Sequence, residues 1–333
     1  MRILAISTHN LRAPFHGAAR LLLSILGALS YKHRVLYLCL NRHASTKCLK
    51  IKARYRSYHS SFNQLTLPLH HFNYRLCRDI AIRIFKVLDF TPDMVLCSSR
   101  ELFALCKLIA NEFNSKLILL QDALRYLFII RPISMIAIPW YTLLTLSSNV
   151  SIAVSEHVER KLRRLTLGLG NVYTIRPTFM LLDDGGLDHQ VDLNIDGTLF
   201  LYSGPLRFIN VLARSYPQLK FVVTGPSAYY ASSLVRAKNL KNVHLMHNIP
   251  DRMLEALYKK IRAAIVIRNV MTGISMTILQ SLYFGTPVIA NPIAVMGYEN
   301  LIKDPEVSKA FMVSNNIREL VKLVGSIVDK DYL

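Results

Sequence analysis

Short apolar runs alternate with stretches of helical periodicity along almost the whole sequence. Such alternation predicts an α/β fold, in which parallel strands form a sheet and the intervening helices cover both of its faces. The predicted strands are Ile3–Ser7, Val35–Leu40, Met94–Cys97, Leu117–Gln121, Ser151–Val154, Leu199–Ser203, Lys220–Thr224, Val243–Met246, Ala264–Ile267 and Pro287–Ala290. The predicted helices are Ala18–Leu29, Tyr74–Leu88, Glu101–Phe113, Ala228–Lys238, Pro250–Ile261, Met276–Phe284 and Ile317–Val328.

An acidic, turn-rich stretch divides this alternation into two series. Residues 178–197 contain five Asp and three Gly in an otherwise basic chain, which is typical of a linker. A single core rarely grows beyond about 250–300 residues, and the chain has 333. We therefore expect two domains, residues 1–177 and residues 178–333.

The charge of the chain is strongly positive and unevenly distributed. Forty-one Lys and Arg stand against 21 Asp and Glu, a net charge of +20, and residues 1–88 hold fifteen of the basic residues with Asp79 as their one acid. This predicts an anionic partner for the N-terminal half: a phosphorylated substrate, an acidic membrane surface or nucleic acid. The hydrophobic content of 52% excludes a disordered chain, and the five Cys without a CxxC pair indicate reduced thiols.

An uncharged stretch, residues 132–155, is long enough to suggest a membrane span. Pro132 and Pro139 interrupt it, and its last residues alternate as a strand does. We therefore expect a buried or interface-seated helix followed by a core strand, with a true span as the alternative. The N-terminal apolar run is too short for a secretory signal and is predicted as the first strand.

The strongest local motif is Thr272-Gly273-Ile274-Ser275, followed by the helix predicted at 276–284. A glycine that permits close backbone approach, followed by a helix N-terminus with unpaired N–H groups, is typical of a phosphate site. A plain strand–loop–helix unit without a ligand is the alternative interpretation.

The stretch from Leu199 to Ala290 resembles the nucleotide-sugar-binding domain of family-4-like glycosyltransferases. The matching segments are LFLYSG, which ends at Gly204, FVVTGP around Gly225, NVHLMHNIPDRMLEALYKKIRAAIVI, and TGISMTILQSLYFGTPVIA. The likeness extends more weakly to HGAARLL around Gly17, TPDMVLCSS and SIAVSEHV. This resemblance implies the GT-B fold, two Rossmann-like domains facing across a cleft, with the acceptor on the first domain and the nucleotide sugar on the second.

The resemblance also implies site residues. The donor-binding set is Gly17, Gly204, Arg207, Gly225, Gly273, Ile274, Ser275 and Gln280, and the catalytic set is His16, Asp122 and Thr272. The chain departs from the family at two Glu with seven residues between them, whose positions hold Thr272 and Gln280. It also departs at a His before Asp, which is replaced by Gln121. Gln280 can still hydrogen-bond a ribose hydroxyl, because an amide both donates and accepts.

The chemistry implied is sugar transfer with retention of configuration, in which a nucleoside diphosphate leaves. Its developing negative charge would be met by the helix N-terminus after Gly273 and by the guanidinium of Arg207. The sequence has no HExxH or CxxC motif, so we expect neither a metal nor another cofactor.

Two basic segments bear on the partner. Residues 47–58 interleave Lys and Arg with Tyr, which suits single-stranded nucleic acid, anionic lipid headgroups or a solvated loop. The helix predicted at Tyr74–Leu88 places Leu76, Ile80 and Ile84 on one face with basic flanks, a pattern that fits a membrane surface or an ordinary sheet-covering helix.

The predicted function is transfer of a sugar from a UDP-, GDP- or ADP-sugar to a lipid-linked or cell-envelope glycan acceptor. The protein is expected in the cytoplasm, docked peripherally on the inner, anionic face of a membrane. One alternative is a non-catalytic relative that binds a nucleotide sugar, since both Glu are replaced. The other is a basic nucleic-acid-binding protein, which charge alone supports.

Overall fold

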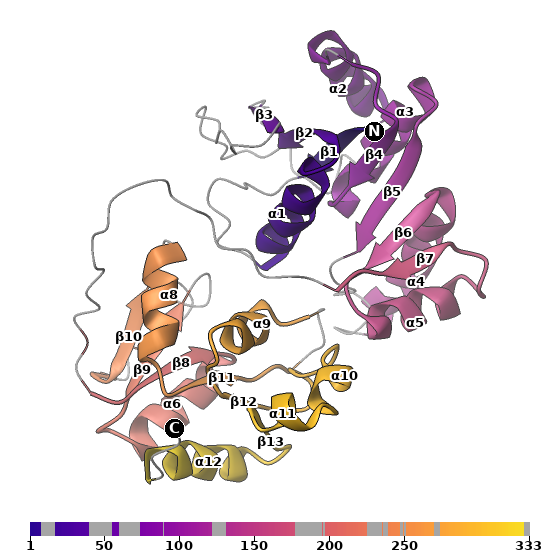
Figure 1. The fold of residues 1–333 in the computed structure, drawn as a ribbon. Helices are drawn as coiled ribbons and strands as arrows, with labels where there is room; N and C mark the ends of the chain where they lie inside the picture. The colour runs from indigo at the N-terminus through magenta and orange to yellow at the C-terminus, as the bar shows by residue number, and fades with distance from the viewer. Residues whose placement is uncertain are drawn as a thin grey trace. The chain divides into compact units, whose positions relative to one another are not determined.

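The computed structural model describes residues 1–7, 17–39, 55–59, 74–88, 90–121, 131–176, 195, 197–224, 235, 239–246, 249, 251–269 and 274–329. The chain folds into two compact units, the first holding most residues up to Thr178 and the second those from Phe179 onward (Figure 1). Each unit is a parallel sheet with helices on both faces, which confirms the predicted α/β class.

The first unit contains a seven-stranded parallel sheet in the order β3-β2-β1-β4-β5-β6-β7. Its strands are β1 (Arg2–Ser7), β2 (Arg34–Cys39), β3 (Tyr55–His59), β4 (Met94–Cys97), β5 (Lys116–Gln121), β6 (Val150–Ala153) and β7 (Val172–Thr174). Its helices are α1 (Gly17–Ser30), α2 (Tyr74–Val87), the 3-10 turn η2 (Arg100–Leu102), α3 (Phe103–Glu112), α4 (Arg131–Ser147) and α5 (Glu156–Leu165). The central strands are apolar along their length because both of their faces are covered.

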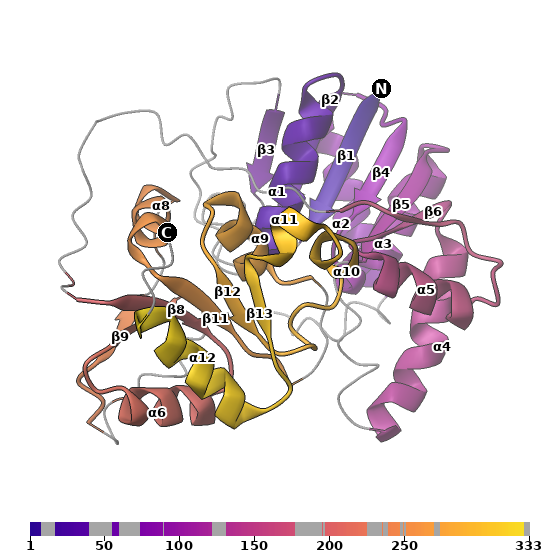
Figure 2. The same ribbon diagram turned by 60° about the horizontal axis from the view of Figure 1, so that its bottom comes forward.

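The second unit contains a six-stranded parallel sheet in the order β10-β9-β8-β11-β12-β13. Its strands are β8 (Leu199–Ser203), β9 (Lys220–Thr224), β10 (Val243–Met246), β11 (Ala263–Val266), β12 (Val288–Ala290) and β13 (Phe311–Val313). Its helices are α6 (Leu206–Ser215), α8 (Asp251–Lys260), α9 (Met276–Tyr283), α10 (Glu299–Ile302), α11 (Pro305–Ser308) and α12 (Ile317–Asp329). Helices α6 and α12 share one core cluster, as Figure 2 shows, and α8 and α9 belong to the cluster on the other face.

Each sheet contains one point at which the strand order reverses. In the first unit this point lies between β1 and β4, and in the second it lies between β8 and β11. Successive crossovers leave such a point in opposite directions, so the loops diverge and open a crevice at the carboxyl ends of the two strands. The topology therefore marks one candidate ligand position in each unit.

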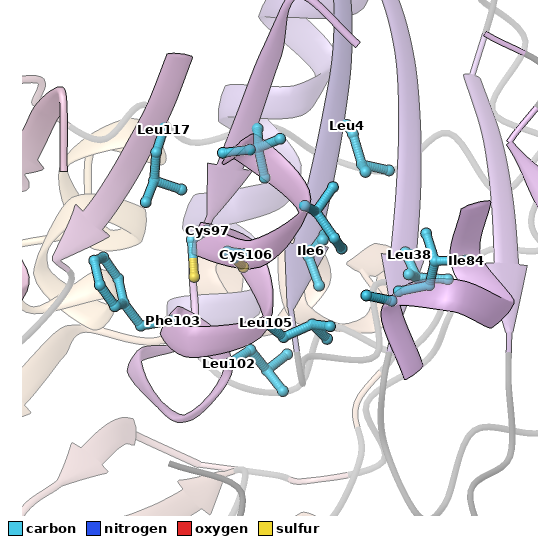
Figure 3. Packing of buried hydrophobic residues seen from close by; sticks show 14 of the residues in the cluster. Leu4, Ile6, Leu38, Ile84, Cys97, Leu102, Phe103, Leu105, Cys106 and Leu117 are labelled. Atoms are coloured by element: carbon cyan, nitrogen blue, oxygen red, sulfur yellow. The ribbon is translucent and has the colours of Figure 1, made fainter. Parts of the chain in front are cut away.

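Helix α2 packs into the core of the first unit. Ile80 and Ile84 are buried in the cluster formed by β1, β2, β4, β5 and α3, and Figure 3 shows Ile84 close to Leu38. Of the two interpretations of this apolar face, the sheet-covering helix is therefore confirmed and a membrane contact of Ile80 and Ile84 is wrong, because both side chains are buried against the sheet. The side chain of Leu76 lies outside the described residues.

Most predicted elements are confirmed within one or two residues. The stretch 132–155 forms α4, which contains Pro139, and then β6, as expected for a helix followed by a core strand. Within the described part of the chain, no helix is both long and apolar enough to cross a membrane. The strands β3, β7 and β13 and the helices α5, α6, α10 and α11 were not predicted. The helix predicted at 228–238 falls almost entirely outside the described residues.

Candidate functional site

An open hollow of about 420 Å³ lies at the carboxyl edge of the second sheet. Its lining consists of Arg207, Ile267, Arg268, Asn269, Asn291, Ile293, Asn315, Ile317 and Leu320. These residues follow the ends of β8, β11, β12 and β13, so the hollow includes the point where the strand order reverses. We call it the β8–β11 hollow.

The turn after β8 brings Arg207 to this hollow. The hydroxyl of Tyr202 donates to the carbonyl of Pro205 at 2.7 Å, and Pro205 then caps α6, whose first turn contains Arg207. A Cβ on Gly204 would lie 2.7 Å from the Tyr202 Oη and 3.1 Å from the Ile267 Cβ. Gly204 is thus required by the close approach of two strand ends, and the exposed Arg207 projects from a tightly packed turn.

A side-chain amide fixes the backbone of Arg268 beyond the end of β11. The Asn291 Oδ1 accepts from the Arg268 N–H at 3.0 Å, while the Asn291 Nδ2 donates to the Arg268 carbonyl at 2.7 Å. This reciprocal pair continues the β11–β12 ladder for one more step through a side chain. Two guanidinium groups and several amides line the hollow without an acidic residue among its described lining, so it suits an anionic ligand.

The start of α9 lies at the same edge of the sheet. Ser275 is its N-cap and is fully buried, yet its hydroxyl makes no cap bond and has no partner among the described residues. The Tyr298 hydroxyl donates to the Ser275 carbonyl at 2.5 Å. Burial raises the pKa of Tyr298, so this hydroxyl stays protonated and holds the N-cap in place. Ile274, just before it, is half-buried.

Gln280 is buried on α9 and its amide is held by α8. The Tyr258 hydroxyl donates to the Gln280 Oε1 at 3.1 Å, and the Tyr258 ring stacks on Phe284 with centroids 5.3 Å apart. The amide oxygen is thus engaged inside the protein. The Gln280 Nε2 has no partner among the described residues and is the group left to meet a ligand.

The carboxyl edge of the first sheet carries uncharged polar groups. The hydroxyls of Ser7 and Ser99 lie 3.2 Å apart at the point where the strand order reverses. On β5, the Gln121 Nε2 donates to the Thr145 Oγ1 at 3.0 Å, while the Gln121 Oε1 and the Ser98 Oγ are buried without a partner among the described residues. Gly17 is the first residue of α1.

Several predicted site residues lie outside the described part of the chain. They are His16, Asp122, Gly225, Thr272 and Gly273. Of the predicted residues that are described, Arg207 lines the hollow and Gly204 supports its turn, whereas Gln280 and Ser275 lie on α9 and outside its lining. The described residues contain no cluster of His, Cys, Asp and Glu that could hold a metal ion.

Sequence reasoning missed Arg268, Asn269, Asn291 and Asn315. A signal for the first two was present, because the polar pair follows the buried β11 after a single residue, Ile267. Asn291 likewise follows β12 directly. Their joint position required the strand order, since Arg268 and Asn291 are 23 residues apart and meet only because β11 and β12 are neighbours.

Solved structures with the same two-unit fold are glycosyltransferases of the GT-B type. Sucrose-phosphate synthase from Thermosynechococcus elongatus superposes with a TM-score of 0.74 at 14% identity, over 99% of this chain and 90% of that chain. HepE of Anabaena in complex with UDP and glucose gives a TM-score of 0.71 at 13% identity, over 99% and 90%. The E. coli trehalose-6-phosphate protein bound with UDP-2-fluoro glucose gives 0.66 at 13% identity, over 98% and 91%. These similarities establish the GT-B fold.

The second unit can be assigned further by sequence. The family described as glycosyl transferases group 1 matches residues 196–332, which is almost the whole of that unit. A search of curated protein sequences gives no match. The match of residues 196–332 to this family and the GT-B fold together support a transferase.

Proposed function

We propose that the protein transfers a sugar from a nucleotide-sugar donor to a lipid-linked or cell-envelope glycan acceptor, with retention of configuration and without a metal ion. The observation that carries the donor part is the β8–β11 hollow at the reversal of strand order, which both Arg207 and Arg268 line. A diphosphate is the ligand chemistry that two guanidinium groups at such a position favour.

The proposed donor mechanism uses fixed positive groups. Arg207 and Arg268 neutralise the diphosphate as the bond between the sugar C1 and the phosphate oxygen breaks. The N-terminus of α9, after Gly273, adds backbone N–H groups and the positive end of the helix dipole. The acceptor hydroxyl forms the new bond to C1, and its proton passes to the departing phosphate oxygen on the same face.

The remaining assignments rest on the position of each residue in the chain. Gln280 presents its Nε2 to a ribose hydroxyl, since Tyr258 engages its oxygen. Thr272 is proposed to contact a sugar hydroxyl, and His16 and Asp122 are proposed to take part in the transfer step. Structural relatives with UDP or UDP-sugars bound, HepE and the E. coli trehalose-6-phosphate protein, support a nucleotide-sugar donor. A lipopolysaccharide outer core galactosyltransferase with a TM-score of 0.59 supports an envelope acceptor.

A second candidate is a relative that binds the donor without turnover. The buried Gln280–Tyr258 hydrogen bond favours it, because a carboxylate position of the family has become an internal contact between two helices. Such a protein would bind a nucleotide sugar and release no nucleoside diphosphate.

A donor screen followed by turnover measurement separates the two. UDP-, GDP- and ADP-sugars are tested by thermal shift, and the stabilising donor is then incubated with and without membrane extract while nucleoside diphosphate is measured. Thr272→Glu with Gln280→Glu is the informative variant, because Tyr258 can donate to a carboxylate as it does to the amide. A transferase gains activity, whereas a protein that only binds gains none. If no donor stabilises the chain, the proposed function is wrong.

A further inference from the structure

Four leucines of the first unit, on α4 and in the loop after α5, are exposed. Leu143 and Leu146 lie on α4 with 56% and 45% of their surface exposed, and Leu167 and Leu169 lie in the loop after α5 with 86% and 77% exposed. On α4, Tyr141 is fully buried, so the helix turns one face to the protein and presents the two leucines on the other.

The loop after α5 and helix α4 are neighbours. The Thr142 Oγ1 donates to the Leu165 carbonyl at 3.2 Å, and a Cβ added to Gly170 would lie 3.0 Å from the Thr145 Cγ2. Figure 1 shows α4 and α5 side by side. We call the exposed side of α4, α5 and residues 166–170 the α4–α5 surface.

The backbone at Leu167 is unusual for an exposed leucine. Its φ is +51°, followed by +81° at Gly168, so a leucine occupies the left-handed position that commonly ends a helix with glycine. The Gly168 N–H donates to the Arg163 carbonyl at 2.8 Å and closes the helix end. Leu167 contributes little to the core and carries a conformational cost. Exposed strain of this kind points to a role outside folding.

Helix α5, which directly precedes the loop with Leu167 and Leu169, exposes basic side chains. Val158 and Leu162 face the sheet, which leaves Arg160 and Arg164 on the exposed side of the helix. Glu159, one of the two acids of α5, is occupied by Arg163 at 2.7 Å. The other, Glu156, pairs with Arg176 at 2.6 Å.

The charge also distinguishes between partners. Burial, followed by the positive charge of Arg164, lowers the pKa of Lys161. A second copy related by a two-fold axis would place this basic helix against its own equivalent. An anionic lipid surface instead offers negative headgroups to the arginines and an apolar layer to the leucines.

We propose that the α4–α5 surface docks on an anionic membrane, with Leu167 and Leu169 inserted below the headgroups and Arg160 and Arg164 among them. This inference deepens the proposed function and rests on it for the lipid-linked acceptor. Helix α5 runs from the carboxyl end of β6 to the amino end of β7, so residues 166–170 lie at the amino edge of the sheet. Docking there leaves the carboxyl edge of the sheet uncovered.

The test is sedimentation of the full chain with phosphatidylcholine vesicles, with and without phosphatidylglycerol, at low and high salt. Leu167→Gly combined with Leu169→Ser should weaken binding at both salt concentrations by about tenfold or more. Arg160→Gln with Arg164→Gln should weaken binding roughly thirtyfold at low salt and much less at high salt. The melting temperature of the leucine variant should not fall, because glycine fits the backbone at position 167 better than leucine.

A matched control removes an exposed apolar side chain from the other unit. Val211 on α6 is exposed to a similar extent as Leu146. The Val211→Ser variant should bind vesicles as the unchanged protein does. Equal vesicle binding by the leucine variant and the unchanged protein would overturn the proposal. A concentration-dependent dimer that the leucine variant abolishes, or retention by heparin with no preference for anionic vesicles, would overturn it in favour of a second copy or a nucleic acid.

Donor titration without vesicles keeps this inference separate from the proposed function. If the leucine variant loses vesicle binding while no nucleotide sugar binds the unchanged protein, the donor proposal fails and membrane docking stands. If a nucleotide sugar binds and the vesicle measurements are unaffected by the substitutions, the docking surface fails and the donor site stands.

Discussion

The two units share a parallel sheet with one reversal of strand order, yet the described polar residues named at the carboxyl ends of their strands differ. In the second unit Arg207 and Arg268 line an open hollow. In the first, Ser7, Ser99 and Gln121 are buried and uncharged. The same topology therefore provides a crevice in each unit, and the residues after the strand ends decide what the crevice can bind.

This difference suggests a division of roles between the units. Guanidinium groups bind an anion, whereas hydroxyl and amide groups exchange hydrogen bonds with a neutral hydroxylated ligand. A nucleotide-sugar transferase requires both kinds of site, because its donor carries a diphosphate and its acceptor reacts through a hydroxyl. The comparison can be tested one edge at a time.

The largest expected effect is on donor binding at the carboxyl edge of the second sheet, where Arg207 and Arg268 line the hollow. Arg207→Ala and Arg268→Ala should each weaken donor binding by about 1.5–3 kcal/mol, because each removes a charged hydrogen bond to the diphosphate. Isothermal calorimetry with the donor that stabilises the chain measures this loss. Arg214→Ala, in the last turn of the same helix as Arg207, is the control and should bind normally. An equal loss in the control would mean that overall charge, rather than the hollow, attracts the donor.

The next effect concerns the packing that supports this edge. Gly204→Ala should lower the free energy of unfolding by about 1–3 kcal/mol, since the new Cβ would lie 2.7 Å from the Tyr202 Oη. Urea denaturation measures the change. Tyr202→Phe in the same chain should recover part of the loss, because the nearest clashing atom is removed. If Gly204→Ala leaves the free energy of unfolding unchanged, the turn after β8 adjusts freely and does not fix Arg207.

A smaller effect on stability is expected at the carboxyl edge of the first sheet, where Gln121 contacts Thr145. Gln121→Met removes a buried amide whose Oε1 has no partner among the described residues, so the free energy of unfolding should change by less than about 1 kcal/mol. Thr145→Val leaves the Gln121 Nε2 unpaired and should cost more, about 1–3 kcal/mol. If Gln121 faces the acceptor, the methionine variant loses transfer while donor binding is kept. Normal transfer would remove Gln121 from the acceptor site.

The sequence predicts most accurately those strands whose side chains are apolar on both faces of the sheet. Strand β8 was predicted with its observed bounds because four of its five residues are buried. Helix α5 was missed because it buries only Val158 and Leu162 among eight polar or partly exposed neighbours. Strand β3 was missed because its sequence, YRSYH, lacks the apolar run that marks a parallel strand.

The site was predictable only where one local segment carries it. Arg207 follows β8 within a single strand–turn–helix segment, so the resemblance to a known family could place it. The pairing of Arg268 with Asn291 depends on strands that are neighbours in space. Likewise, the periodicity of α2 indicated an apolar face, but the sequence could not show that the sheet covers Ile80 and Ile84 while Leu167 stays exposed.

The smallest expected effect is on the pH dependence of stability. It is tested by comparing two ion pairs of the same spacing, one in each unit. Arg163 pairs with Glu159 on α5 at 2.7 Å, and Lys259 pairs with Glu255 on α8 at 2.6 Å. Glu159 also accepts from the Thr174 hydroxyl on β7 at 2.5 Å. The Thr174 hydrogen bond, followed by the Arg163 contacts, lowers the pKa of Glu159 below its usual value.

The sign of the pH effect follows from this shift. A carboxylate with a lowered pKa in the folded state contributes stability that is present above its unfolded pKa and is lost as the pH falls through the folded value. Glu159→Gln should therefore flatten the acid side of the stability curve below about pH 4.5, by a small amount because Glu159 remains partly exposed to solvent. Urea midpoints from pH 3 to pH 7 measure it, with Glu255→Gln as the matched control. A change of equal size in the control would mean that the ion pair alone, without the bond to Thr174, sets the acid response.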